Sequence, residues 1–176
     1  MPSHVLVTAV AFVSMTLWGT TAQATDTVVA GNLAWASPLK APEVNGGWGF
    51  DLRLGQRLNG EVVAVTGELD AGYYDFGGPL APAVYRGMAG ARLGVGAILR
   101  PLVFVHAGLA RATFRPPPGT DLNRTGFTYD VGGGLDFVLL PLVNLGVYAG
   151  YNFVASTTGV DSLKWASLGL NAELVF

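Results

Sequence analysis

The last stretch of the chain, residues 164–176, alternates between apolar and polar or small side chains. One set of alternate positions holds Ala166, Leu168, Leu170, Ala172, Leu174 and Phe176, and the other holds Ser167, Gly169, Asn171 and Glu173. Successive side chains of a β-strand point to opposite faces, so this stretch predicts a strand with one apolar and one polar face. Such a strand needs an apolar environment on one side and polar groups on the other.

Seven earlier segments show the same alternation. They cover residues 27–35, 47–58, 61–74, 84–98, 102–114, 124–138 and 143–153. Longer loops alternate with tight turns, which we expect at Asn59-Gly60, at residues 99–101 and at residues 139–141. The pattern predicts an all-β fold, an eight-stranded antiparallel up-and-down transmembrane β-barrel, with both termini on the side of the tight turns.

Charged residues follow the polar faces of the predicted strands. The set is Asp51, Arg53, Glu68, Asp70, Arg86, Arg92, Asp130, Asp136 and Glu173. No charged residue falls on an apolar face within a strand body, and the exceptions Asp75, Arg111 and Lys164 lie at strand ends next to the longer loops. An Arg on the lipid face at the bilayer midplane costs about 2–4 kcal/mol, so this segregation favours lipid on the apolar side. Glycines on the polar faces fit a narrow lumen.

Two alternatives share parts of this pattern. A soluble lipocalin-like barrel also alternates, but its apolar face points inward around a ligand. A helical membrane bundle is suggested by the apolar segments 93–110 and 131–154, which Pro101, Asp136 and Pro141 interrupt. Composition favours a membrane protein, because only 12% of residues are charged, against about 25% in soluble domains.

Aromatic residues gather near the ends of the apolar faces. Near the loops lie Trp35, Trp48, Phe50, Tyr73, Tyr85, Phe127, Tyr129, Tyr151 and Phe153, and near the opposite end lie Phe137 and Phe176. Two such girdles are typical of the membrane–water interfaces of a barrel. Aromatic residues also favour strands in general, but that preference does not place them at strand ends.

The first residues have the features of a secretory signal peptide. Residues 5–18 are apolar, and Ala22-Gln23-Ala24 forms a small-x-small cleavage site. We expect a signal peptide over residues 1–24 and a barrel domain over residues 25–176. The segment before the apolar run lacks Lys and Arg, and an uncleaved anchor is the alternative, although the run is shorter than the roughly 20 residues that a spanning helix needs.

This combination resembles the OmpA-type transmembrane domain and its small OmpX-like relatives. The resemblance rests on the signal peptide, the eight alternating strands, tight turns such as Asn59-Gly60, and the terminal Leu174-Val175-Phe176. It implies a location in the outer membrane of a Gram-negative-type bacterium, among outer-membrane lipids and lipopolysaccharide. It also implies periplasmic chaperones and barrel-assembly machinery that reads Leu174 and Phe176. The chain stops at the barrel, so we expect no peptidoglycan-binding activity.

The interior should hold a network of paired charges, because buried charges must be paired or solvated. The candidate residues are Asp51, Arg53, Glu68, Asp70, Arg86, Arg92 and Asp130. A two-residue turn at Asn59-Gly60 pairs Leu58 with Glu61 and therefore sets Asp51 opposite Glu68. The network predicts a plugged lumen with a structural, envelope or surface-interaction role, and a narrow pore for small solutes or ions is the alternative.

Enzymatic chemistry has little support in the sequence. After signal removal His106 is the only histidine, with no His-x-Ser, and a three-residue turn sets Gly94 opposite it. Without cysteine or clustered ligands we expect no metal and no cofactor, and Gly132-Gly133-Gly134 lacks the Lys-Ser/Thr of a phosphate loop. A net charge of −2 argues against nucleic acid. Short loops argue against a large recognition surface, and the oligomeric state is not indicated.

Overall fold

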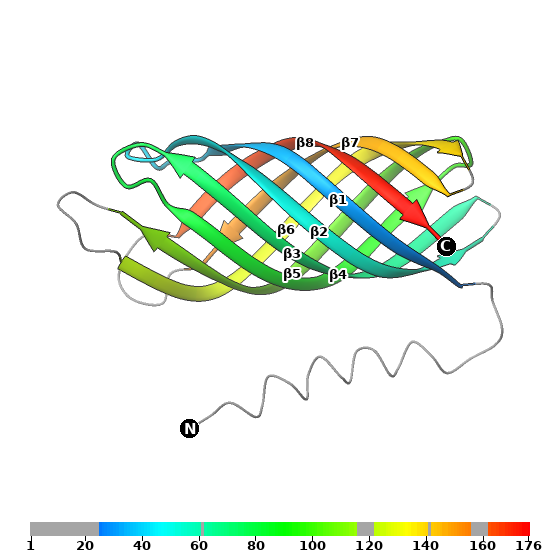
Figure 1. Cartoon of the computed structure of the whole chain (residues 1–176), viewed down its shortest axis with the longest axis horizontal. Coiled ribbons are helices and arrows are strands. Elements are labelled where there is room, and N and C mark those ends of the chain that lie inside the picture. The colour runs from blue at the N-terminus through cyan, green and yellow to red at the C-terminus, as the bar shows by residue number, and fades with distance from the viewer. Residues whose placement is uncertain (1–24, 61, 116–121, 141, 156–161) are drawn as a thin grey trace, which may run out of the picture.

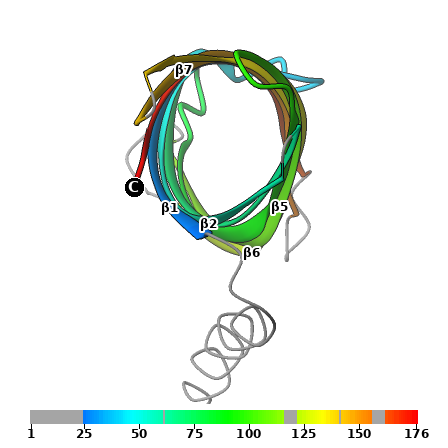
Figure 2. The ribbon, with the colours of Figure 1, turned by 90° about the vertical axis from the view of Figure 1, so that its right-hand side faces the viewer.

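The computed structural model describes residues 25–60, 62–115, 122–140, 142–155 and 162–176. They form eight antiparallel strands closed into one barrel, in the order predicted from the alternation (Figures 1 and 2). The strands are β1 (Thr25–Pro38), β2 (Asn45–Asn59), β3 (Val63–Gly77), β4 (Ala83–Val95), β5 (Leu99–Phe114), β6 (Leu122–Leu140), β7 (Val143–Val154) and β8 (Leu163–Val175). The predicted signal peptide, residues 1–24, and parts of two loops, residues 116–121 and 156–161, lie outside the described residues.

The first and last strands close the barrel. Thr27 and Phe176 exchange backbone hydrogen bonds of 2.9 Å, and Ala30 pairs with Glu173. This end also carries the β2–β3, β4–β5 and β6–β7 connections and is called the turn end; the opposite end, with the other four connections, is called the loop end (Figure 1). The described part of the chain contains no helix with the length and apolar character needed to span a bilayer.

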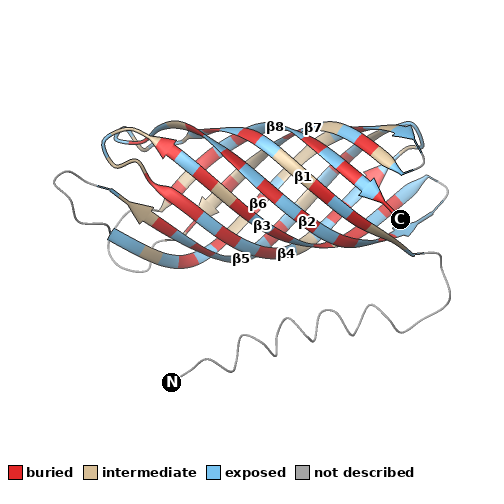
Figure 3. Cartoon of the chain, in the orientation of Figure 1, coloured by how far each residue is buried: buried red, intermediate tan, exposed pale blue. Residues whose placement is uncertain are grey.

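The two faces of the barrel wall differ completely in polarity. Outward side chains such as Leu52 and Leu170 are 60% and 62% exposed, whereas the inward Asp51 and Glu173 are each 1% exposed. Figure 3 shows this alternation along the strands. A lipocalin-like barrel has the reverse arrangement, and soluble proteins rarely expose so large an apolar surface. Both alternatives are therefore wrong: the apolar face points outward, and residues 93–110 and 131–154 form strands rather than helices.

Aromatic side chains stand on the outer wall at both ends, as the sequence pattern predicts. Trp48, Tyr85 and Phe127 are about half exposed near the loop end, and Phe137 and Phe176 are exposed toward the turn end. Phe50, Tyr73 and Tyr85 of neighbouring strands form a chain of ring contacts at 5.9 and 4.7 Å. An apolar wall bounded by aromatic side chains is the surface that a lipid bilayer requires.

The predicted register of the β2–β3 hairpin is wrong, although its faces are right. Asn59 still pairs with Ala64, so the turn lies beyond Asn59 and the register differs from the Leu58–Glu61 pairing. Asp51 consequently faces Gly72 rather than Glu68, and Arg53 faces Asp70. The predicted register would have set two carboxylates directly opposite each other, which is destabilising.

The β4–β5 turn also lies earlier than predicted, at residues 96–98 instead of 99–101. Gly96 has φ of 118°, a conformation that other residues rarely adopt, and its N–H donates to Val62 O at 2.8 Å. The shift moves Gly90, not Gly94, opposite His106. A Cβ at position 90 would lie 2.3 Å from His106 Cδ2, so only glycine leaves room for the imidazole ring. At the third turn, Leu139 and Leu140 belong to β6.

Candidate functional site

The inward faces of the strands place a continuous set of charged side chains in the middle of the barrel and toward the turn end. This lumen network consists of the carboxylates Asp51, Glu68, Asp70, Asp130, Asp136 and Glu173, the arginines Arg53, Arg57, Arg86 and Arg92, and His106, all of them buried. Six of the strands, β2 to β6 and β8, contribute these residues through their alternation, because residues two apart share a face. All seven residues predicted to form an interior network therefore lie in one lumen.

Arg86 is the centre of the part nearest the loop end. Its Nη2 donates to Asp51 Oδ1 at 2.8 Å, and its Nη1 lies 3.2 Å from Asp130 Oδ2. Asp70 Oδ1 lies 3.8 Å from Arg86 Nε, and Nη1 also donates to Asn152 Oδ1 at 2.6 Å. One guanidinium thus faces three carboxylates, which matches the planar fork of donors that arginine offers.

His106 joins this part to the next. Its Nδ1 lies 2.6 Å from Asp130 Oδ1 and its Nε2 lies 2.7 Å from Glu68 Oε1. Only the doubly protonated ring can donate to both carboxylates. Glu68 also lies 3.4 Å from Arg53 and 3.5 Å from Arg92, so the imidazole bridges two groups of ion pairs.

The part nearest the turn end centres on Glu173 of β8. Glu173 accepts hydrogen bonds from Arg57 and, at 2.6 Å, from Asn144 Nδ2, and it lies 3.5 Å from Arg92 Nη1. Asp136 accepts from Asn171 Nδ2 at 3.1 Å. Arg57 was not among the candidates from sequence, although it shares a face with Asp51 and Arg53. The same alternation that selected Arg53 would have found it.

Little open space remains among these side chains. The cavity inside the network has a volume of about 20 Å³, and a site needs roughly 10–15 Å³ to hold one water. Its lining includes Asp51, Arg92, Phe104, His106 and Tyr148. Among the described residues, the space inside the network is therefore close to the size of a single water molecule.

A second, apolar layer fills the interior on the loop-end side of the network. This loop-end core comprises Ala36, Val44, Tyr74, Phe76, Val84, Ala110, Ala112, Val154, Leu163 and Trp165. Trp165 is fully buried, with its ring centroid 5.3 Å from that of Tyr74 and 5.5 Å from that of Phe76. The Tyr74 hydroxyl donates to Asp51 Oδ2 at 2.8 Å and so connects the two layers. This core was not predicted from the sequence.

The site offers ion pairing rather than evident catalysis. Both ring nitrogens of His106 face carboxylate oxygens, which leaves neither free to activate a hydroxyl. Among the described residues no cluster of three or more His, Asp, Glu or Cys is arranged to hold a metal ion. Leu174 and Phe176, the predicted assembly signal, are exposed on the outer wall at the turn end.

Comparison with known proteins gives structural matches only. No protein-family model matches the chain, and no curated protein matches it. Neisserial surface protein A (NspA) is 17% identical in sequence, with a TM-score of 0.61, over 86% of this chain and 97% of that one. Ail of Yersinia pestis is 16% identical, with a TM-score of 0.57, over 88% of this chain and 99% of Ail.

A third match is an enzyme. The outer-membrane enzyme PagL is 20% identical, with a TM-score of 0.56, over 81% of this chain and 97% of PagL. This chain has the fold of the small outer-membrane barrels. The resemblance expected from the sequence is confirmed at the level of the fold, and that fold occurs both in an enzyme and in surface proteins.

Proposed function

We propose that this protein is an integral barrel of the outer membrane of a Gram-negative-type bacterium, with a closed lumen and a structural, envelope or surface-interaction role. The observation that carries the proposal is the inverted polarity of the wall, with exposed leucines outside and buried ion pairs inside. The fold shared with NspA and Ail supports the same location.

Membrane fractionation combined with gel mobility tests this location. We expect the protein in the outer-membrane fraction, as a compact band that shifts when the sample is boiled. A soluble protein whose mobility does not change on heating would contradict the proposal.

The lumen network serves, in this proposal, to hold the barrel wall together and to block passage. The cavity of about 20 Å³ and the loop-end core both support a closed lumen. A narrow pore for small solutes or ions is the second candidate, since a chain of charges lines the interior. Planar-bilayer recordings separate the two: we expect no reproducible conductance steps, and steps that Arg92→Ala alters would contradict the closed lumen.

We propose a non-enzymatic role, which the surroundings of His106 support; PagL has the same fold and is an enzyme, so the role needs a direct test. Lipase and esterase assays on the folded protein provide the test. Clear turnover that His106→Ala abolishes would show that the barrel is an enzyme.

The proposed partners of the barrel are of two kinds: ligands at its surface, and the proteins that assemble it in the membrane. Ail has been crystallised with the heparin analogue sucrose octasulfate, which makes an anionic ligand a reasonable class to test here. We also propose that lipopolysaccharide and other outer-membrane lipids surround the barrel, and that periplasmic chaperones and the barrel-assembly machinery deliver it. Leu174 and Phe176 would form the assembly signal, after cleavage of residues 1–24.

A further inference from the structure

The positive charges of this chain are distributed unevenly. Of ten Lys and Arg residues, four arginines lie in the lumen network and Arg100 lies by the β4–β5 turn at the turn end. The remaining cations are Lys40, Arg111, Arg115, Arg124 and Lys164, all of them at the loop end. Arg124 lies on the inward face, since it pairs with the buried Ala112, and the described part of the loop end also carries the acids Glu43 and Asp75. The cations on the outer wall, Arg111 and Lys164 among them, therefore lie at the loop end.

Two of these arginines project from one strand onto the outer wall. Arg111 and Arg115 lie four residues apart at the end of β5, on the side of the strand that carries the outward Leu109, and both are exposed. Arg115 N donates to Leu80 O of the β3–β4 loop at 2.9 Å, which fixes the backbone at this point. No carboxylate of the described residues lies within ion-pair distance of either guanidinium.

Neutral polar groups surround the two arginines. Thr113 lies between them and donates to Asn123 Oδ1 of β6 at 2.8 Å, while Arg111 pairs across the strands with Thr125 on one side and Tyr85 on the other. The rim patch is defined as Arg111, Thr113, Arg115, Asn123 and Thr125. It combines two positive charges with hydroxyl and amide side chains. The exposed acid Asp75 stands on the outer wall two strands away, since Asp75 and Thr113 both pair with Ala83.

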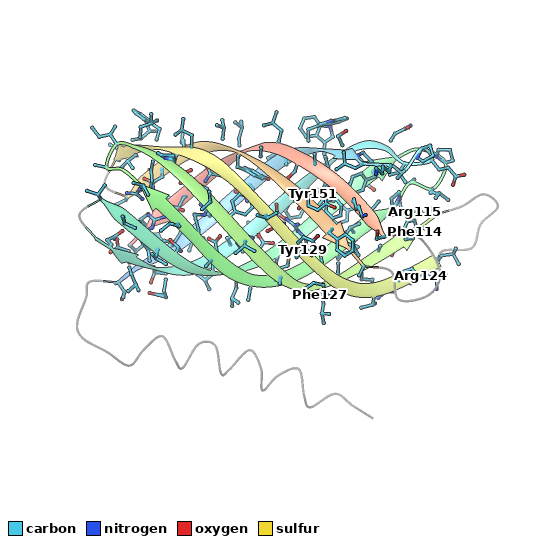
Figure 4. The ribbon with its side chains drawn as sticks, turned by 180° about the vertical axis from the view of Figure 1, so that it is seen from behind. Phe114, Arg115, Arg124, Phe127, Tyr129 and Tyr151 are labelled. Atoms are coloured by element: carbon cyan, nitrogen blue, oxygen red, sulfur yellow. The ribbon has the colours of Figure 1, made fainter. Side chains whose placement is uncertain are left out.

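An aromatic wall continues from the rim patch toward the middle of the barrel. It is formed on β6 and β7 by Phe127, Tyr129, Tyr151 and Phe153, whose ring centroids lie 5.0–6.3 Å apart. Figure 4 shows Arg115 and Arg124 at the loop end, with Phe127, Tyr129 and Tyr151 further along the wall. Aromatic side chains of barrels mark the membrane–water interface, so the rim patch lies at the level of lipid head groups.

We propose that the rim patch binds the phosphate of an anionic lipid whose acyl chains lie along the aromatic wall. The inference rests on the proposed outer-membrane location. Arginine is suited to phosphate because its planar donors match two phosphate oxygens. A lipid fits better than a soluble polyanion, because the two arginines stand on the outer wall in direct continuity with the apolar surface. The lipid phosphate would then contact the two guanidinium groups, and the acyl chains would contact the rings of the aromatic wall, on one continuous surface.

The test measures binding to the folded full-length barrel in dodecyl maltoside micelles. The probes are bisphosphorylated lipid A, its dephosphorylated derivative, and the soluble polyphosphate inositol hexakisphosphate. An arginine near an anionic surface contributes about 1 kcal/mol, so we expect each of Arg111→Ala and Arg115→Ala to weaken lipid A binding about fivefold and the double variant about thirtyfold. Lys40→Ala removes an exposed charge from another loop at the same end and should bind as the wild type does.

Three results would each overturn the inference. The double variant could bind lipid A as tightly as wild type, which would mean that the two arginines of the rim patch do not bind the lipid. Dephosphorylated lipid A could bind equally well, which would mean that binding depends on apolar contact and not on the phosphate. Inositol hexakisphosphate could displace lipid A completely and bind as tightly, which would indicate a site for soluble polyanions. Gel mobility confirms that each variant is folded, and fractionation of cells tests the outer-membrane location separately.

Discussion

The lumen network and the loop-end core lie next to each other along the axis of the same barrel and fill it in different ways. In the network, one group serves several partners: Arg86 faces Asp51, Asp70 and Asp130. In the core, Trp165 packs against the rings of Tyr74 and Phe76. The network depends on the balance of charges, whereas the core depends on filled volume. Equal losses of side-chain size should therefore have different consequences in the two regions.

The largest effect is expected from Arg86→Ala. The substitution leaves three buried carboxylates without their shared cation, and breaking a buried ion pair by removing one partner costs about 3–5 kcal/mol. We expect the free energy of unfolding to fall by that amount, measured by urea titration of the folded barrel followed by gel mobility without boiling. Arg86→Lys keeps the charge but not the fork of donors, so it should recover part of the loss.

The matched control for Arg86→Ala is Arg111→Ala, which removes the same side chain from the exposed outer wall. Surface substitutions of this kind usually change stability by less than about 0.5 kcal/mol. If both variants lose the same stability, the carboxylates around Arg86 are not held by its charge, and the contrast between the two regions fails.

The next effect is expected from Trp165→Ala in the loop-end core. Removing a buried indole leaves a cavity, and such truncations cost about 3 kcal/mol or more. Trp165→Phe keeps most of the volume and should cost less than about 1.5 kcal/mol. The same urea titration measures both. A Phe variant as unstable as the Ala variant would mean that the region depends on more than volume.

The two regions also differ in how far the sequence predicts them. Alternation places Asp51, Arg53 and Glu68 on one face whatever the register, because a shift by two residues on each strand keeps every side chain on its side. It does not say which partners meet. The hairpin register was therefore wrong, and ion pairs between distant strands, such as Arg92 of β4 with Glu173 of β8, required the closed barrel.

The loop-end core was missed for a related reason. Alternation puts Tyr74 with Asp70 and Trp165 with Ser167 on the polar faces, but only the charged members of those faces were considered as interior residues. Phe76 was assigned to a loop, because Gly77, Gly78 and Pro79 follow it. The strands in fact extend to Gly77 in β3 and begin at Leu163 in β8, which brings these side chains inside the wall. Strand boundaries are the least certain part of a prediction from sequence, and the core lies at the boundaries.

A smaller effect than that of Arg86→Ala or Trp165→Ala is expected from Tyr74→Phe, at the point where the two regions meet. The ring of Tyr74 packs on Trp165, while its hydroxyl donates to Asp51 Oδ2 at 2.8 Å and accepts from Arg86 Nη2 at 3.2 Å. Phenylalanine keeps the ring and removes only the polar arm, so we expect a loss of about 1.5 kcal/mol in unfolding free energy, the magnitude of a hydrogen bond to a charged group.

Double-mutant cycles show to which region that loss belongs. Tyr74→Phe should couple to Asp51→Asn by more than about 0.5 kcal/mol, because both change one hydrogen bond, and should add independently to Trp165→Phe. Coupling to Trp165 but not to Asp51 would mean that the hydroxyl acts by positioning the ring. The hydrogen bond between Tyr74 and Asp51 would then not connect the two regions, and Tyr74 would belong to the loop-end core alone.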